Sequence, residues 1–390
     1  MLLTLATGAA MANYAFAPIS PFLARELCWG KTEIGLLGAA GATGTMVFAV
    51  ASGLGVDRLG PRWFMLVGPL VMGLGCLGLS SFGSFTSALA WSFLVGVGFS
   101  TLTPMSNRAI YEWFPERGQA FAIGLKQAGI PLGTAAAALL FTAVSEQHGW
   151  RASYRAASVT IAALGMVAFL CYRDPLKRCP AHAEGGAPPD GPAGAVHVSC
   201  AMASCAAAGM AFAMWQISLT TFLVAYLQEV LGMPLAVASR LLALTQVGGG
   251  AARPWSGAIS DILWHGRRKP LIVLLGLANL VCILVLTEGR SVLAGQWLTP
   301  FMLVLGAVTM GWFGPFFALM VEAYGRQKAG LASGLAATLN LVGQTLGAPL
   351  FGYVVDVTGS FRPALLLFVG LMAAATAAYW AWGAEAPERE

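Results

Sequence analysis

The chain has 390 residues, of which 57% are hydrophobic and only 10% are charged, and its formal net charge is +5. Soluble domains carry about 25% charged residues. This composition excludes a water-soluble domain of this length and indicates an integral membrane protein.

Twelve segments of the chain are long and apolar enough to cross a bilayer, which takes about 20 mostly apolar residues per helix. A transmembrane β-barrel would instead show short segments of alternating hydrophobicity. We therefore predict an all-α membrane protein with twelve transmembrane helices. In chain order the predicted helices cover 2–24, 32–55, 62–83, 86–112, 118–143, 152–172, 199–227, 235–262, 269–287, 297–322, 329–354 and 363–383.

The segment between the sixth and seventh predicted helices has a different composition. Residues 173–197 contain five prolines and several glycines, which prevent a regular helix. Its histidines and cysteine do not have the spacing of a zinc site, so we expect no metal and no cofactor. The predicted parts of the chain are an N-terminal six-helix half (1–172), a cytoplasmic linker (173–198), a C-terminal six-helix half (199–383) and a cytoplasmic tail (384–390).

The distribution of basic residues predicts the orientation, because loops rich in lysine and arginine stay in the cytoplasm. If the N-terminus is cytoplasmic, twelve basic residues fall in inside loops and seven in outside loops. The even number of helices agrees with this arrangement. We therefore predict a multi-pass protein of the cell inner (plasma) membrane with both termini in the cytoplasm.

Two loops indicate an internal repeat. The loop after the second predicted helix reads GLGVDRLGPRW from Gly53, and the loop after the eighth reads GAISDILWHGRRK from Gly257. Both contain G-x-x-x-D, then a glycine, then basic residues. The fourth and tenth helices also end alike, at Glu112 and Glu322, each followed by basic residues. Matching loops in two halves are expected of parallel repeats about an axis normal to the membrane.

The sequence GLGVDRLGPR resembles the signature loop of the major facilitator superfamily, and the weaker second copy strengthens the match. The resemblance covers essentially the whole chain, and it implies two pseudo-symmetric six-helix halves that transport a solute by alternating access. Two departures concern the details of the loops. Pro61 stands where a basic residue is commoner, and the second copy has no arginine directly after Asp261.

The duplicated loops are predicted to form a gate at the cytoplasmic rim. Small residues let helices approach closely, and an aspartate at a helix end accepts bonds from backbone amides or pairs with arginine. The resemblance implies that such networks lock the cytoplasmic side and break when it opens; the alternative is topogenic charge without a gating role. The residues assigned to this gate are Gly53, Asp57, Arg58, Gly60, Arg62, Arg108, Glu112, Arg117, Gly257, Asp261, Arg267, Glu322 and Arg326.

Three basic residues fall within predicted helices, where an ionisable side chain is costly and marks a functional site by default. Arg108 lies four residues before Glu112, so we predict an intrahelical ion pair. Lys126 and Arg253 lie roughly 13 and 12 Å from the cytoplasmic ends of their helices, at 1.5 Å per residue. No acidic residue falls at that depth to neutralise them. Because unpaired buried charge is unfavourable, we expect an anionic substrate as their partner. The alternative is that helix carbonyls satisfy both side chains or that the side chains extend to water.

Polar side chains near the middle of other helices complete the predicted substrate site: Asn13, Tyr14, Gln216, Gln246, Asn340 and Gln344. Each alone is equally consistent with a helix–helix hydrogen bond. The stretch WFPERGQAFAIGLKQAGIPLG and the A-R-P sequence at 252–254 resemble the monocarboxylate, oxalate/formate and cyanate-type porters. In that branch an arginine of the eighth helix binds the carboxylate, and Arg253 matches its position. The lysine that oxalate-type porters have in the eleventh helix is absent.

These observations predict a secondary active transporter of a small organic anion, driven by a proton or by anion exchange. A drug or solute efflux antiporter of the same fold is the alternative, although pumps for cations usually need a carboxylate in mid-membrane. A membrane-embedded enzyme is a remote alternative, because no metalloprotease or nucleophile-elbow motif is present. The expected partners are the anionic substrate, a proton as candidate coupling ion and the lipid bilayer. We expect a monomer without a nucleic-acid partner.

Overall fold

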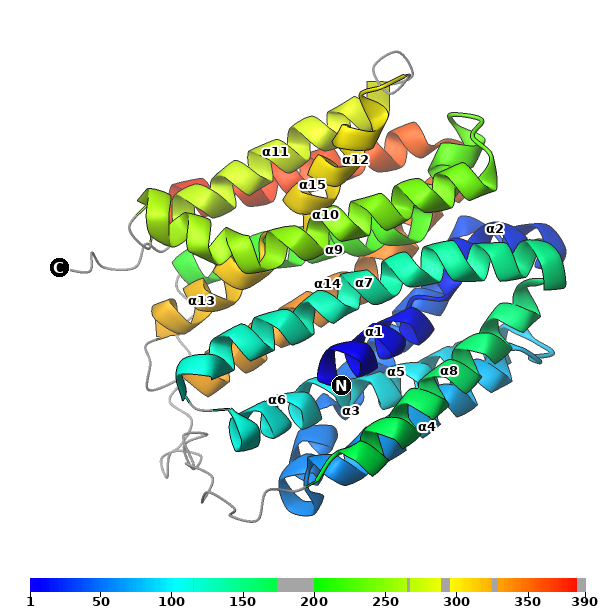
Figure 1. The fold of residues 1–390 in the computed structure, drawn as a ribbon. Helices are drawn as coiled ribbons and strands as arrows, with labels where there is room; N and C mark the ends of the chain where they lie inside the picture. Colours follow the sequence, from blue (N-terminus) through cyan, green and yellow to red (C-terminus); the bar gives the residue numbers. More distant parts are fainter. Residues whose placement is uncertain (115, 174–199, 265–266, 289–294, 325–328, 384–390) are drawn as a thin grey trace.

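The structure, a computed structural model, describes residues 1–114, 116–173, 200–264, 267–288, 295–324 and 329–383 (Figure 1). This part of the chain forms fifteen α-helices and contains no strand. They are α1 (Leu2–Asn13), α2 (Phe16–Leu27), α3 (Lys31–Leu59), α4 (Pro61–Leu79), α5 (Phe85–Ser100), α6 (Leu102–Trp113), α7 (Glu116–His148), α8 (Trp150–Cys171), α9 (Cys200–Glu229), α10 (Leu235–Trp264), α11 (Lys269–Glu288), α12 (Leu298–Met310), α13 (Phe313–Tyr324), α14 (Ala329–Thr358) and α15 (Phe361–Trp382).

The fifteen helices correspond to the twelve predicted membrane spans, so the predicted fold class is confirmed. Eleven segments within the described residues are long and apolar enough to cross a membrane. The remaining predicted span is occupied by α14, which has 30 residues. Three spans consist of two helices each, namely α1 with α2, α5 with α6, and α12 with α13.

Each of these three breaks lies four residues before a proline. Pro18 has no N–H to donate to the carbonyl of Tyr14, and Ala17 donates to that carbonyl instead, at 3.2 Å. Pro104 and Pro315 stand in the same relation to Ser100 and Gly311. Because proline removes the hydrogen bond to residue i−4 and its ring clashes with that carbonyl, the helix is interrupted at each of these places.

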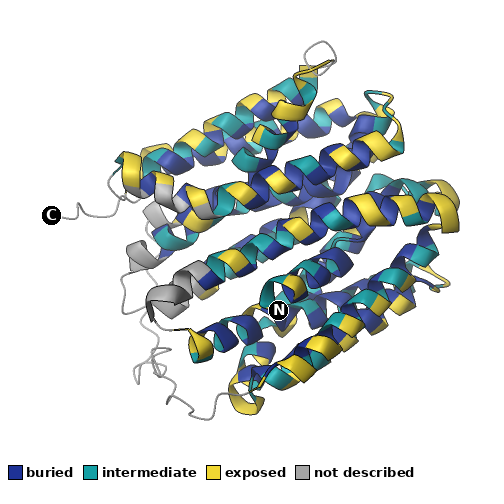
Figure 2. Ribbon diagram, viewed as in Figure 1, coloured by how far each residue is buried: buried dark blue, intermediate teal, exposed yellow. Residues whose placement is uncertain are grey.

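Buried hydrophobic side chains form two clusters. The first is drawn from α1–α8, here called the first bundle, and includes Phe141 and Trp150. The second is drawn mainly from α9–α15, here called the second bundle, and includes Trp215 and Trp312. Figure 2 shows exposed residues along the outer faces of the helices, and many of those with large side chains are apolar, which suits contact with lipid. The predicted linker and tail lie almost entirely outside the described residues, so their boundaries stay predictions.

The two bundles meet along α3 with α14 and along α7 with α10. We call the end of the molecule where α3 and α10 begin the distal end, and the opposite end the linker end. At the distal end, a Cβ atom placed on Gly352 would lie 2.3 Å from the carbonyl oxygen of Lys31. The side chain of Lys31 forms an ion pair with Glu229, and Thr142 shares a hydrogen bond of 2.8 Å with Ser239. The bundles are therefore tightly joined at the distal end.

Candidate substrate-binding site

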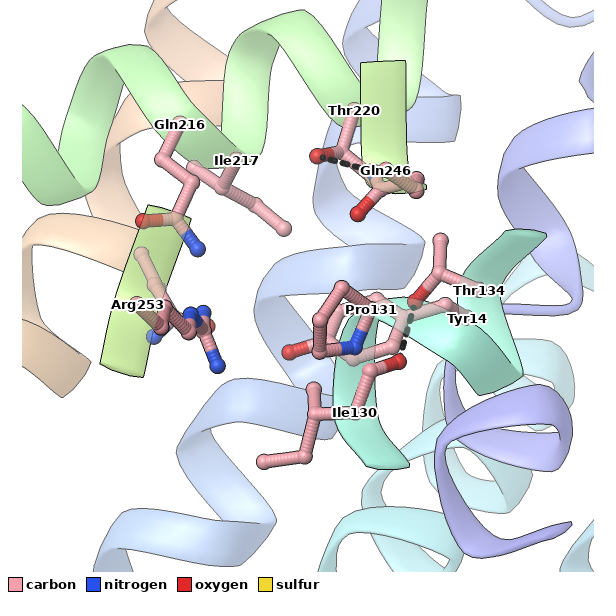
Figure 3. Close-up of a pocket in the computed structure, with 10 residues that line it drawn as sticks. Tyr14, Ile130, Pro131, Thr134, Gln216, Ile217, Thr220, Gln246 and Arg253 are labelled. Atoms are coloured by element: carbon pink, nitrogen blue, oxygen red, sulfur yellow. Dashed lines mark hydrogen bonds between the residues drawn. The ribbon is translucent and has the colours of Figure 1, made fainter. Parts of the chain in front are cut away.

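A small pocket lies between the two bundles (Figure 3). The first bundle contributes Tyr14 from the α1/α2 break and three residues of α7. The second bundle contributes residues from α9, α10 and α14. The ten lining residues are Tyr14, Ile130, Pro131, Thr134, Gln216, Ile217, Thr220, Gln246, Arg253 and Gln344. None of these ten is acidic.

Arg253 carries the positive charge of this pocket. Its guanidinium carbon lies 5.0 Å from the centre of the Phe313 ring, a distance at which a cation is attracted to an aromatic face. The Nε atom is buried and has no hydrogen-bond partner among the described residues. An arginine has five N–H donors and cannot lose its charge. The pocket therefore offers unused donors on a cation.

Two glutamines line the same pocket as this cation. Trp312 Nε1 donates a hydrogen bond of 3.2 Å to Gln216 Oε1. Gln246 is buried, and its Nε2 donates to the hydroxyl of Thr220 at 3.1 Å. Figure 3 shows both glutamines reaching toward the space that Arg253 also faces. Amides held in this way can bind the polar groups of a small ligand.

The remaining predicted residues of the second bundle are Gln344 and Asn340, which lie on α14. Gln344 lines the pocket and donates through Nε2 to Asn340 Oδ1. Asn340 is buried and is not among the lining residues. In the first bundle, Asn13 is also absent from the lining residues, although it precedes the lining residue Tyr14. Of the eight predicted binding residues, the structure thus brings five to the pocket.

Lys126 is not brought to this pocket. It lies one turn before Ile130 on α7, but its amino group donates to Asn107 Oδ1 on α6 at 3.2 Å. The side chain is only 2% exposed. The predicted joint site of Lys126 and Arg253 is therefore not assembled in this conformation, because Lys126 points into the first bundle.

Comparison with known proteins settles the family. Residues 2–348 match the family model of the Major Facilitator Superfamily. The chain belongs to the major facilitator superfamily. The chain is 25% identical over 385 residues to the hexuronate transporter of Bacillus subtilis, an alignment that covers 92% of this chain and 87% of that protein.

Two further similarities are more limited. A probable sulfoacetate transporter of Cupriavidus necator is 24% identical over 135 residues, which cover 35% of this chain and 31% of that protein. The xylose transporter of E. coli in its inward-open conformation superposes with a TM-score of 0.75 at 14% identity, over 98% of this chain and 96% of that one. The last similarity concerns the fold alone. As a member of the facilitator family, the protein is a transporter and not an enzyme.

Sequence reasoning missed several pocket residues of this facilitator. Thr134 and Thr220 line it, and so do Ile130 and Pro131. A signal was available for Thr220, which lies one helical turn after Gln216 and therefore on the same face of α9. The roles of Trp312 and Phe313 as contacts of Gln216 and Arg253 required the three-dimensional structure.

At the linker end, part of the predicted gate network is present. Arg108 Nε and Glu112 Oε1 form the predicted ion pair at 2.6 Å, and the hydroxyl of Tyr172 donates to Glu112 Oε2 at 3.0 Å. Asp57 Oδ1 lies 3.9 Å from Arg108 Nη1. These contacts join the last turn of α3 and the residue after α8 to α6, and their gating role stays a prediction.

Other gate residues have structural positions of their own. Gly60 has a φ of +83°, which favours glycine, at the turn between α3 and α4. Arg62 donates through Nε to the carbonyl of Phe169 at 3.3 Å and packs on its ring. Arg58 is exposed, and the backbone N–H of Arg267 donates to the carbonyl of Trp264 at 2.9 Å.

One expectation about the gate is wrong in this conformation. A Cβ atom on Gly53 would meet no atom within 4 Å, so Gly53 does not mediate a close helix contact here. The remaining gate predictions fall on positions outside the side chains that the structure describes: Arg117, Gly257, Asp261, Glu322 and Arg326.

Proposed function

We propose that the protein is a secondary active transporter that moves a small organic anion, a carboxylate, across the inner membrane by alternating access. The observation that carries this proposal is Arg253. Its guanidinium faces a pocket between the two bundles, its buried Nε has no partner among the described residues, and none of the ten lining residues is acidic. A carboxylate supplies the missing partner through charge-assisted hydrogen bonds, which are about twice as strong as neutral ones.

The similar proteins support the same class of substrate. The relatives reported above are named as transporters of hexuronate and sulfoacetate, both of which are organic acids. The amides of Gln216 and Gln246 suit a ligand with further polar groups. An efflux antiporter for cations is less favoured, because a cationic ligand would meet the charge of Arg253 without a carboxylate in the described lining.

The orientation and coupling belong to the same proposal. We place the linker end and both termini in the cytoplasm, with halves at 1–172 and 199–383, because the basic loops gather there. The contacts of Lys31 and Glu229 at the distal end then close the outer face, as in an inward-facing state. We expect the protein to act as a monomer, with transport driven by a proton or by an exchanged anion. Reporter fusions at the two termini test their cytoplasmic location.

Calorimetry on the purified protein tests the substrate class. The panel contains lactate, succinate and glucuronate, with glucose as the neutral counterpart of glucuronate and a tetraphenylphosphonium cation as an efflux-type ligand. We expect one or more of the anions to bind and both other compounds to fail. Arg253→Gln should abolish this binding, whereas Arg240→Gln, an exposed arginine on the same helix, should leave it unchanged. Binding of the cation alone would contradict the proposal and support efflux.

Proteoliposomes then test the coupling. Uptake of the bound anion is measured with an imposed pH gradient, and separately with vesicles preloaded with the same anion. Uptake that follows the pH gradient indicates a proton symporter, and uptake that requires preloading indicates an exchanger. An absence of uptake under both conditions would contradict transport of that anion.

A further inference from the structure

The break in the tenth span places two consecutive aromatic residues against two donors of the pocket. Trp312 lies within the break between α12 and α13, and Phe313 begins α13. The indole of Trp312 donates to Gln216 Oε1 at 3.2 Å. The ring of Phe313 lies 5.0 Å from the guanidinium carbon of Arg253. One short segment therefore contacts both the amide and the guanidinium.

The hydrogen bond from Trp312 fixes the orientation of the Gln216 amide. An indole N–H can only donate, so the group of Gln216 that faces Trp312 must be its carbonyl oxygen. The NH₂ group, with its two donors, is then left for the pocket. Figure 3 shows the amide nitrogen of Gln216 pointing into the space that Arg253 also faces. Without Trp312 the amide could turn its oxygen toward an incoming anion.

The indole itself is held rigidly. Trp312 is 0% exposed. Its ring stacks on Phe212 at 5.4 Å between centroids and meets the edge of Phe316 at 5.3 Å. The break that allows this placement follows from Pro315, which cannot donate to the carbonyl of Gly311. The position of the indole N–H is therefore set by packing and does not depend on a ligand.

We propose that Trp312 and Phe313 are positioning residues for the substrate anion. Trp312 turns the NH₂ group of Gln216 toward the pocket, and Phe313 supports the guanidinium of Arg253 against its ring. The two donors, which both belong to the second bundle and lie on the same side of the pocket in Figure 3, then bind the two oxygens of one carboxylate. This inference rests on the proposed transport of a carboxylate and assigns the residues that orient its binding groups.

Trp312→Phe tests the proposal, because it keeps the stacked ring and removes only the N–H donor. One neutral hydrogen bond corresponds to about a 3- to 10-fold change in affinity, and we expect a loss of that size for the tightest-binding anion of the panel. In a Gln216→Met background, which already lacks the amide, Trp312→Phe should have no further effect. An effect of equal size in both backgrounds would show that Trp312 acts structurally and would overturn the proposal.

The matched control is Trp215→Phe. Trp215 is also buried and precedes Gln216 on α9, but its N–H donates to Thr309 at 3.2 Å and not to a pocket residue. This variant should bind the anion as the wild type does. Phe313→Leu should weaken binding about 2- to 5-fold, the size expected for a cation–π contact, and should have no further effect in the Arg253→Gln background.

Size-exclusion chromatography and thermal unfolding establish that each variant is folded. If Trp312→Phe is not monodisperse, Gln216→Met alone tests the proposal. Loss of the oriented NH₂ group should then weaken anion binding about 3- to 10-fold. Unchanged affinity in Gln216→Met would overturn the proposal. A wild type that binds no anion would contradict the proposed function, whereas Arg253-dependent binding that is unaffected by Trp312→Phe would contradict only this inference.

Discussion

The carboxylate of Asp356 accepts two hydrogen bonds from Thr32, one from its backbone N–H at 2.7 Å and one from its hydroxyl at 2.5 Å. It also accepts the backbone N–H of Lys31 at 2.8 Å. The first N–H groups of a helix have no partner within the helix, and Gly30, the residue that precedes α3, has no side chain to cap them. Asp356 on α14 therefore caps a helix of the other bundle.

This cap should stabilise the closed distal end. A capping side chain contributes about 1 kcal/mol, and an anion at a helix N-terminus is favoured by the helix dipole. We expect Asp356→Ala to shift the population toward opening of the distal end by about 5-fold. The measurement uses spin labels attached to cysteines at the exposed positions Ser81 and Pro234, one in each bundle, in a background without other cysteines. Opening of the distal end increases the distance between the two labels.

A matched control is available for this variant. Glu288→Gln removes an exposed ion pair with Arg362 at 2.7 Å, and both of these residues belong to the second bundle. Glu288→Gln should leave the distance distribution between the two spin labels unchanged, because the Glu288–Arg362 ion pair does not connect the two bundles. A distribution in Asp356→Ala that matches the wild type would show that the cap does not hold the bundles together.

Arg253→Lys tests the geometry of the guanidinium while it keeps the charge. A guanidinium can form two parallel bonds to a carboxylate, which an ammonium cannot. Loss of one charge-assisted bond in a partly dry site should cost about 2–3 kcal/mol, or roughly 30- to 150-fold in anion affinity. Titration calorimetry with the best anion of the panel measures it. Wild-type affinity in Arg253→Lys would mean that only the charge matters.

Asp57→Asn should slow transport while the protein stays folded. The carboxylate is 68% exposed and 3.9 Å from Arg108 Nη1, so its neutralisation should change stability by less than about 1 kcal/mol. A role in the gate requires the charge during the conformational change, which predicts a large fall in the initial rate of uptake by proteoliposomes. Uptake at the wild-type rate would reduce the loop to a signal for orientation.

Much of the fold was predictable because twelve long apolar runs have only one stable form in a bilayer. The Arg108–Glu112 ion pair also followed from the spacing of four residues on one helix. The breaks at Tyr14 and Gly311 were missed, although a proline four residues later marks each of them. The break at Gly311 allows Trp312 to contact Gln216. This contact depends on how α9 packs against the break, so no local sequence pattern predicts it.

The candidate site was predictable in part for the same reason. Tyr14, Gln246 and Arg253 are polar residues within apolar helices, and such residues turn inward because lipid cannot solvate them. Lys126 is also a polar residue that turns away from lipid, but its side chain points into the first bundle and not into the pocket. Its long side chain has several possible partners within reach, and depth along the helix did not distinguish the pocket from Asn107.

Lys126 gives the last prediction. Because its amino group binds Asn107 and not the pocket, Lys126→Met should weaken anion binding less than about 5-fold, far below the loss expected for Arg253→Lys. Replacement of a buried charge by an apolar side chain of similar length is often neutral or stabilising, so the midpoint of thermal unfolding should hold or rise. Asn107→Leu, by contrast, leaves the buried ammonium without its amide partner and should lower that midpoint by several degrees.

Calorimetry and thermal unfolding on both variants distinguish the two roles of Lys126. If Lys126 instead joins Arg253 on a substrate with two negative charges in another conformation, Lys126→Met will weaken succinate binding as strongly as Arg253→Lys does, while lactate binding changes little. Equal losses of more than about 5-fold for both anions would mean that the charge of Lys126 acts on the pocket from a distance through its electrostatic potential. A loss smaller than about 5-fold for both anions agrees with an amino group that binds only within the first bundle.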